Sequence, residues 1–134
     1  MNIIEWEPAL SIGVDVVDEQ HKGLVDMINA AYTLASEESN PMQVNRLLAQ
    51  MGRYAVLHFS TEEQLMKQAG YAGMEEHKAI HAKFTKQVSD FACDGSQDRP
   101  LAVFVFLSTW LKEHIMGMDR EYAVEVREML ESKS

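Results

Sequence analysis

The sequence has few of the features of a secreted or membrane protein. It contains one cysteine, Cys93, in 134 residues, so no internal disulfide can form and we expect a cytoplasmic protein. The longest nearly apolar run, 101–111, is too short to cross a bilayer, so we expect no stable membrane insertion. The first ten residues lack the basic start and the long apolar stretch of a signal peptide, so none is expected.

Basic residues are also scarce. Twelve lysines and arginines stand against 21 aspartates and glutamates, which gives a net charge of −9. No nucleic-acid binding is expected, because a basic patch that could neutralise phosphates is missing. The 134 residues, 46% of them apolar, suffice for one domain with a real core, and we expect a single domain over 1–134.

Proline and glycine are few, and several of them fall where helices are expected to begin or end. Between them apolar residues recur every three or four positions, which is typical of amphipathic helices, and no strand pattern is present. Asp18 is expected to cap the first helix, Asn40 and Pro41 to start the second, and Pro100 to open the fourth. The helices are expected at about 18–35, 41–69, 74–91, 100–118 and 121–130.

This order of elements predicts an all-α protein. Four long helices with short connections form an up-down-up-down antiparallel four-helix bundle, in which metal sites lie between facing helices. An irregular N-terminal arm over 1–17 and a short C-terminal helix complete the expected fold.

All five histidines fall on the apolar stripes of the expected helices, together with two carboxylates. A buried imidazole or carboxylate is costly unless something compensates it. The cheapest compensation for such groups converging in an apolar interior is a bound metal, and seven ligands are too many for one tetrahedral ion. The sequence therefore predicts two metal ions, held by His21, His58, Glu62, His77, His81, His114 and Asp119.

Taken singly, these residues have more ordinary explanations. A lone histidine on a stripe, such as His21, is usually a hydrogen-bonded core residue. A His-x-x-x-Glu pair such as His58 and Glu62 is usually a surface hydrogen bond, and His77 and His81 form either a zinc clamp or a chance pair. Independent accidents would not place every histidine on an inner face, so the joint pattern favours the metal.

His114 and Asp119 form the least regular pair. Five residues at about 100° each leave the two side chains ~140° apart on a straight helix. They meet at one site only if the helix breaks or unwinds between them, which Gly117 would tolerate. The alternative is that Asp119 caps the following helix, and for this pair alone that alternative is favoured.

Several other chemistries lack the residues that they need. His77 has no glutamate after it, as a zinc protease motif would require. The paired Glu-x-x-His motifs of ferritin-like di-iron bundles are absent. No glycine-rich phosphate loop is present, and Cys93 has no nearby histidine to act as its base.

With these motifs in view, the sequence resembles the hemerythrins, and most closely the single-domain bacteriohemerythrins. The resemblance covers nearly the whole chain. It is carried by Trp6, Ile12-Gly13-Val14, Asp18-Glu19-Gln20-His21, His58-Phe59-Ser60-Thr61-Glu62-Glu63, the His77/His81 pair, Trp110-Leu111-Lys112-Glu113-His114 and Asp119.

The resemblance implies two iron ions, Fe2+ or Fe3+, joined by an oxo or hydroxo bridge. One iron would be bound by His77, His81 and His114, the other by His21 and His58, and both by the bridging carboxylates of Glu62 and Asp119. The two-histidine iron would then have an open position for dioxygen. The resemblance also implies a dioxygen pocket lined by four apolar residues, for which plain core packing is the alternative: Leu24, Phe59, Trp110 and Leu111.

We therefore expect reversible dioxygen binding rather than enzymatic activity, for storage, for delivery to an oxygen-consuming enzyme, or for sensing. A histidine-rich site with only two anionic side chains is expected to bind dioxygen reversibly rather than to support higher-valent iron. Two alternatives stay open. One is a di-iron redox enzyme that reduces nitric oxide or hydrogen peroxide, and the other is a module whose di-iron state is read by a partner protein. The oligomeric state is left open by the sequence.

Overall fold

The computed structural model describes residues 4–37, 40–94 and 98–132. No strand occurs within these ranges, and the expected all-α architecture is confirmed. The elements in chain order are the 3-10 turn η1 (Pro8–Leu10), α1 (Asp15–Ser36), α2 (Pro41–Ala69), α3 (Met74–Cys93), α4 (Arg99–Trp110), the π-helical segment η2 (Leu111–Met118) and α5 (Asp119–Ser132).

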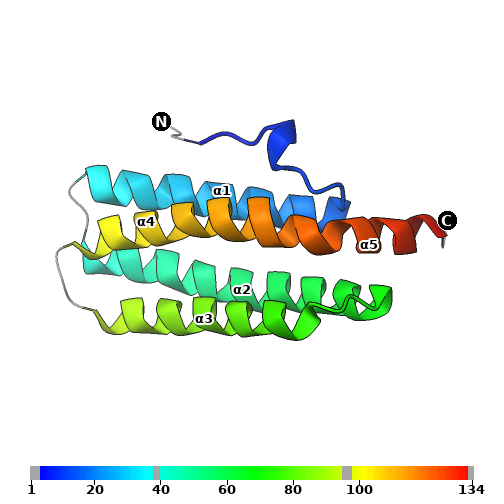
Figure 1. The fold of residues 1–134 in the computed structure, drawn as a ribbon. Helices are drawn as coiled ribbons and strands as arrows, with labels where there is room; N and C mark the ends of the chain where they lie inside the picture. Colours follow the sequence, from blue (N-terminus) through cyan, green and yellow to red (C-terminus); the bar gives the residue numbers. More distant parts are fainter. Residues whose placement is uncertain (1–3, 38–39, 95–97, 133–134) are drawn as a thin grey trace.

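The helices lie side by side in a four-helix bundle, as the sequence predicts (Figure 1). α1 packs against α2 and α4, and α2 packs against α3 and α5. α5 continues α4 through η2, so these three segments together form the fourth column of the bundle (Figure 1). The expected short C-terminal helix is therefore an extension of the fourth helix, and it begins at Asp119 rather than at Glu121.

The ends of α2 follow from local sequence. Asn40 caps its start: the Asn40 side chain accepts a hydrogen bond from the backbone N–H of Gln43 at 3.0 Å, and the Gln43 side chain accepts one from the backbone N–H of Asn40 at 2.9 Å. Pro41 occupies the first helical position, where a missing N–H costs nothing. Gly70 ends the helix with a φ of 69°, a conformation that glycine adopts without steric strain. These expected boundaries are confirmed.

The predicted role of Asp18 is wrong. α1 begins three residues earlier, at Asp15, with Val14 as its N-cap. The Asp18 carboxylate instead accepts hydrogen bonds from the Ser11 hydroxyl at 2.5 Å and from the Ile12 N–H at 2.9 Å. Asp18 therefore ties the arm to α1, because its carboxylate accepts hydrogen bonds from the arm rather than from the N–H groups of the helix.

Two apolar clusters fill the bundle, with polar side chains between them. Along α1, Val17 belongs to the smaller cluster and Leu24 to the larger one, and His21 lies between the two. Glu62 has the corresponding place along α2. Across the described ranges no single helix is long and apolar enough to cross a membrane, although the bent pair Arg99–His114 and Asp119–Ser132 passes that test on length and composition alone.

Candidate metal centre

The seven predicted ligand side chains are buried and lie together. None of the seven residues is more than 2% exposed. Their donor atoms form two groups that share one carboxylate, and within each group the atoms lie within 4.8 Å of one another. One group is Glu62, His77, His81 and His114, and the other is His21, His58, Glu62 and Asp119. The helices thus bring together every residue that the sequence singled out for metal binding.

The α2 and α3 residues meet through ordinary helical geometry. His58 and Glu62 are one turn apart on α2, and His58 Nε2 lies 2.9 Å from Glu62 Oε1. His81, on α3, reaches the same oxygen from the other side, with its Nε2 at 3.3 Å. Glu62 Oε1 is therefore placed between one histidine of each group.

His114 and Asp119 meet because the helix is underwound between them. The backbone N–H of Asp119 donates to the carbonyl oxygen of His114, five residues earlier, which is the hydrogen bond of a π-helix. A π turn brings residues five apart onto one face, and Asp119 Oδ1 lies 3.0 Å from His114 Nε2. The condition set by the sequence, an unwound segment, is thus met. The alternative of a helix cap is wrong, because Asp119 has helical φ and ψ of −66° and −29° and its side chain points into the cluster.

Asp119 also contacts both histidine groups. Its Oδ1 lies 2.9 Å from His77 Nε2, and its Oδ2 lies 3.1 Å from His21 Nε2. His21 Nε2 in turn lies 3.1 Å from His58 Nε2. The two oxygens of one carboxylate therefore face histidines of different groups, which is the arrangement that a bridging ligand needs.

The donor atoms fit a metal better than they fit one another. Several of them lie within about 3 Å of a partner yet are not aligned for hydrogen bonding. Buried atoms with no hydrogen-bond partner among the described residues include Glu62 Oε1, both oxygens of Asp119, and the Nε2 atoms of His77, His81 and His114. Such buried polar atoms call for a partner. Imidazole nitrogens and carboxylate oxygens that point toward common centres provide a donor set suited to divalent transition metals, iron among them.

The electrostatics keep both carboxylates ionised. Burial and the nearby Asp119 raise the pKa of Glu62, but His58 and His81 outweigh them and lower it to about 2. Despite burial, the pKa of Asp119 is held well below its ordinary value by its histidine neighbours, His114 first among them. Both side chains are therefore anionic at neutral pH, which is the form that binds a metal.

Outer contacts hold the ligands in place, and the sequence reasoning did not identify them. His58 Nδ1 lies 2.7 Å from the Gln20 side-chain oxygen, and His81 Nδ1 lies 3.0 Å from Glu63 Oε2. The Tyr122 hydroxyl donates to Glu62 Oε2 at 2.6 Å. Gln20 and Glu63 adjoin ligands in the sequence, and this adjacency is the one signal that could have pointed to them.

The four apolar residues expected around a dioxygen pocket are all buried and belong to the larger cluster. The Phe59 ring stacks on His81 with centroids 3.9 Å apart, and the Trp110 ring stacks on His114 at 4.1 Å. Leu24 is 0% exposed and Leu111 6%. Phe59 and Trp110 thus cover histidines of the three-histidine group. Tyr54, which the sequence reasoning did not single out, stacks on His58 at 5.0 Å.

Comparisons with known proteins agree with this geometry. Residues 12–126 match the model of the hemerythrin family, described as the hemerythrin HHE cation binding domain. The chain is 33% identical to a bacteriohemerythrin of Stenotrophomonas maltophilia (strain R551-3), covering 95% of this chain and 84% of that protein. It is 32% identical to a bacteriohemerythrin of Clostridium acetobutylicum, covering 87% and 96%. A crystal structure of wild-type hemerythrin superposes with a TM-score of 0.78 at 29% identity, covering 92% of this chain and 98% of that one.

Proposed function

Since the chain belongs to the hemerythrin family, we propose that its buried cluster holds two iron ions and binds dioxygen reversibly. The observation that carries the proposal is the pair of four-residue donor groups, closed off from solvent and sharing Glu62. A pair of ferrous ions can supply the two electrons that take dioxygen to the oxidation level of peroxide and can recover them on release.

The contacts support a division of the side chains between two ions. His77, His81 and His114 would hold one ion, and His21 and His58 would hold the other. Asp119 would bridge them, since its two oxygens face histidines of both groups. Glu62 would be the second bridge, because its Oε1 lies between His58 and His81. The ion with two histidines would have one protein ligand fewer, which would leave room there for dioxygen.

The rest of the chain supports reversibility by excluding water. Leu24, Phe59, Trp110 and Leu111 are buried in the larger apolar cluster beside the ligands. An apolar surrounding keeps out water and protons, which would otherwise displace the reduced dioxygen and leave the iron in the ferric state. The protein would serve as a store of dioxygen, as a carrier that delivers it to an oxygen-consuming enzyme, or as a sensor.

Iron content and repeated oxygenation test this function. Metal-free protein is loaded with ferrous iron under argon, and iron is counted before the visible spectrum is followed through cycles of air and argon. We expect two irons per chain and a spectrum that recovers in each cycle. Rapid one-way oxidation would contradict a carrier and would favour the redox enzyme that reduces nitric oxide or hydrogen peroxide.

A matched pair of variants shows whether the iron sits in this cluster. Asp119→Ala removes a carboxylate that faces three histidines, and we expect iron to fall to one per chain or less. Asp90→Ala removes a carboxylate that is 55% exposed on α3, and we expect two irons to remain. Equal iron content in the two variants would place the metal elsewhere.

A further inference from the structure

Two ligand histidines, one from each group, are supported by different chemistry. His58 points its Nδ1 at the neutral amide of Gln20, 2.7 Å away. His81 points its Nδ1 at the carboxylate of Glu63, 3.0 Å away. Both contacts cross between helices, from α1 to α2 and from α2 to α3. The two metal positions therefore differ in their surroundings as well as in their number of ligands.

The Gln20 amide is held in one orientation. Its Nε2 donates to the Thr61 hydroxyl at 3.1 Å, and that hydroxyl donates to the Leu57 carbonyl oxygen at 2.9 Å. With its N–H group used in this way, Gln20 presents its oxygen to His58. His58 then donates from Nδ1, so its Nε2 carries the lone pair that a metal binds. Gln20 thus fixes the histidine without adding charge.

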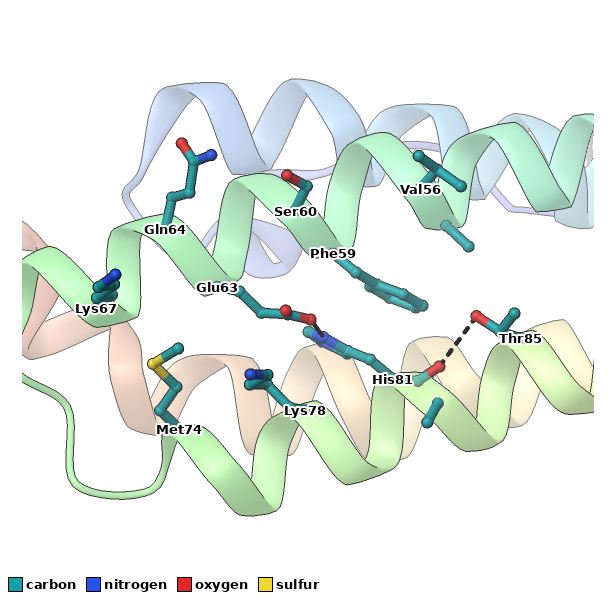
Figure 2. Close-up of a pocket in the computed structure, with 12 residues that line it drawn as sticks. Val56, Phe59, Ser60, Glu63, Gln64, Lys67, Met74, Lys78, His81 and Thr85 are labelled. Carbon is teal, nitrogen blue, oxygen red and sulfur yellow. Dashed lines mark hydrogen bonds and ion pairs between the residues drawn. The ribbon is translucent and has the colours of Figure 1, made fainter.

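Glu63 fixes His81 in the same sense but brings a negative charge. An ionised carboxylate only accepts, so His81 donates from Nδ1 and keeps Nε2 for a metal. Figure 2 shows Glu63 reaching from α2 toward His81 on α3. Both residues line a pocket of about 500 Å³. The Glu63 side chain is 28% exposed, whereas His81 is 2% exposed. A carboxylate behind an imidazole makes that imidazole a stronger donor to its metal.

We propose that Glu63 and Gln20 are positioning residues that make the two iron positions unequal. Glu63 stabilises the ferric state at the three-histidine position, whereas Gln20 holds the two-histidine position without that stabilisation. This inference rests on the proposed di-iron function. A stronger donor favours the more highly charged ion, so the charge on Glu63 lowers the reduction potential of the centre. Neutral support at His58 keeps the position proposed for dioxygen closer to ferrous.

Isosteric exchanges separate charge from position. Glu63→Gln keeps an acceptor for His81 and removes the charge, and Gln20→Glu keeps an acceptor for His58 and adds one. The midpoint potential of the iron-loaded proteins is measured by mediated titration under argon, with iron counted in each sample. We expect two irons in both variants, a midpoint shifted upward in Glu63→Gln, and a midpoint shifted downward in Gln20→Glu.

Glu19→Gln is the control for net charge. Glu19 adjoins Gln20 in α1, but its side chain is 71% exposed and pairs with Lys22. It loses the same single charge as Glu63→Gln, and we expect its midpoint to match the unchanged protein. An unshifted midpoint in Glu63→Gln, or an equal shift in Glu19→Gln, would overturn the charge effect.

Zinc affinity tests the positioning role without any redox chemistry. Glu63→Ala and Gln20→Ala remove the acceptors altogether, and we expect zinc to bind about 10- to 100-fold more weakly than to the unchanged protein. Unchanged zinc affinity in both alanine variants would show that neither residue positions a ligand. The proposed function fails if the unchanged protein binds iron but its spectrum does not recover through cycles of air and argon. The midpoint potentials and zinc affinities would still show whether Glu63 and Gln20 position the ligands.

Discussion

Two parts of the site reach the same centre by different backbone geometry. In α2 and α3 the paired ligands stand four residues apart on regular α-helices, as His58 and Glu62 do. His114 in η2 and Asp119 at the start of α5 stand five residues apart, and the backbone hydrogen bond between them spans five residues as well. The α2–α3 side follows the helical pattern of the sequence, whereas the fourth column departs from it where it contributes ligands.

The difference shows that helix geometry alone positions one part of the site, whereas the other part depends on contacts within the site. The α2 and α3 pairs need nothing beyond helix geometry and an apolar face. A π-helical segment is rare: it appears mostly as a single turn inside an α-helix, and it is frequently found at functional sites. We therefore expect η2 to depend on the metal more strongly than α2 and α3 do.

Metal removal gives the largest expected effect. We expect iron-loaded protein to exceed metal-free protein in stability by more than ~4 kcal/mol when free metal stands about 1,000-fold above its dissociation constant. Hydrogen exchange measured on both forms should show that amide protection falls further in η2 and α5 than in α2 and α3. Protons compete with metal for histidines and carboxylates, so the difference between the two forms should shrink as the pH falls. Equal melting temperatures would mean that the metal does not lie in the core.

Truncation of Leu111, the first residue of η2, is next in size. Leu111→Ala should cost about 2–5 kcal/mol of unfolding free energy as a buried large-to-small change. It should also admit water near the iron, so that oxidation of the oxygenated form to the ferric form speeds up while dioxygen still binds at first. Denaturant unfolding and the decay of the oxygenated spectrum measure the two effects.

Leu47→Ala is the matched change on the other side of the comparison. Leu47 is as buried as Leu111, 5% exposed against 6%, but it lies in α2 about three turns before His58. It should destabilise the protein comparably and leave oxidation nearly unchanged. If both variants lose the oxygenated spectrum at the same rate, the effect of Leu111→Ala reflects a general loss of stability, and Leu111 does not line the dioxygen pocket.

The same contrast explains which parts of the structure could be predicted from the sequence. His58, Glu62, His77 and His81 were predictable because α-helical spacing converts sequence distance directly into a shared face. For Asp119 only a condition could be predicted, an unwound helix, because a shift from four- to five-residue hydrogen bonds leaves no periodic signal in the sequence.

Contacts between elements were beyond the sequence for a related reason. Asp18 and Asp15 both suit a helix start, and the arm's donors at Ser11 and Ile12 decide what Asp18 does. Gln20 and Glu63 meet their histidines across helix interfaces. Such pairings depend on helix rotation and offset, which apolar stripes fix only coarsely.

Tyr122 tests how far the fourth column supports a ligand on α2. Its hydroxyl is buried and donates to Glu62 Oε2 at 2.6 Å. Tyr122→Phe removes this donor and leaves a buried carboxylate oxygen without it, so we expect a loss of about 1.5–3 kcal/mol, measured by denaturant unfolding. Tyr54→Phe is the control, because the Tyr54 hydroxyl is buried with no hydrogen-bond partner in the described part of the chain. Its removal should be neutral or stabilising, and equal losses in both variants would show that the Glu62 bond contributes little.

The smallest expected effect concerns Gly117, inside η2. The sequence suggested that glycine permits the unwinding, yet the positive φ angles in the described residues are those of Gly13 and Gly70. Apart from its two chain neighbours and the nearby backbone of its own helix, a Cβ at Gly117 would meet no described atom within 4 Å. The unwinding thus comes from the π hydrogen bonds and not from a conformation reserved for glycine.

Gly117→Ala should leave the iron content at two and raise the unfolding free energy by about 0.5–1 kcal/mol, because alanine loses less backbone entropy on folding. Gly70→Ala is the matched control: a Cβ there also meets nothing within 4 Å, but the φ of 69° is strained for alanine and should cost about 1–2 kcal/mol. A loss in Gly117→Ala as large as that in Gly70→Ala would restore glycine as the cause of the unwound turn.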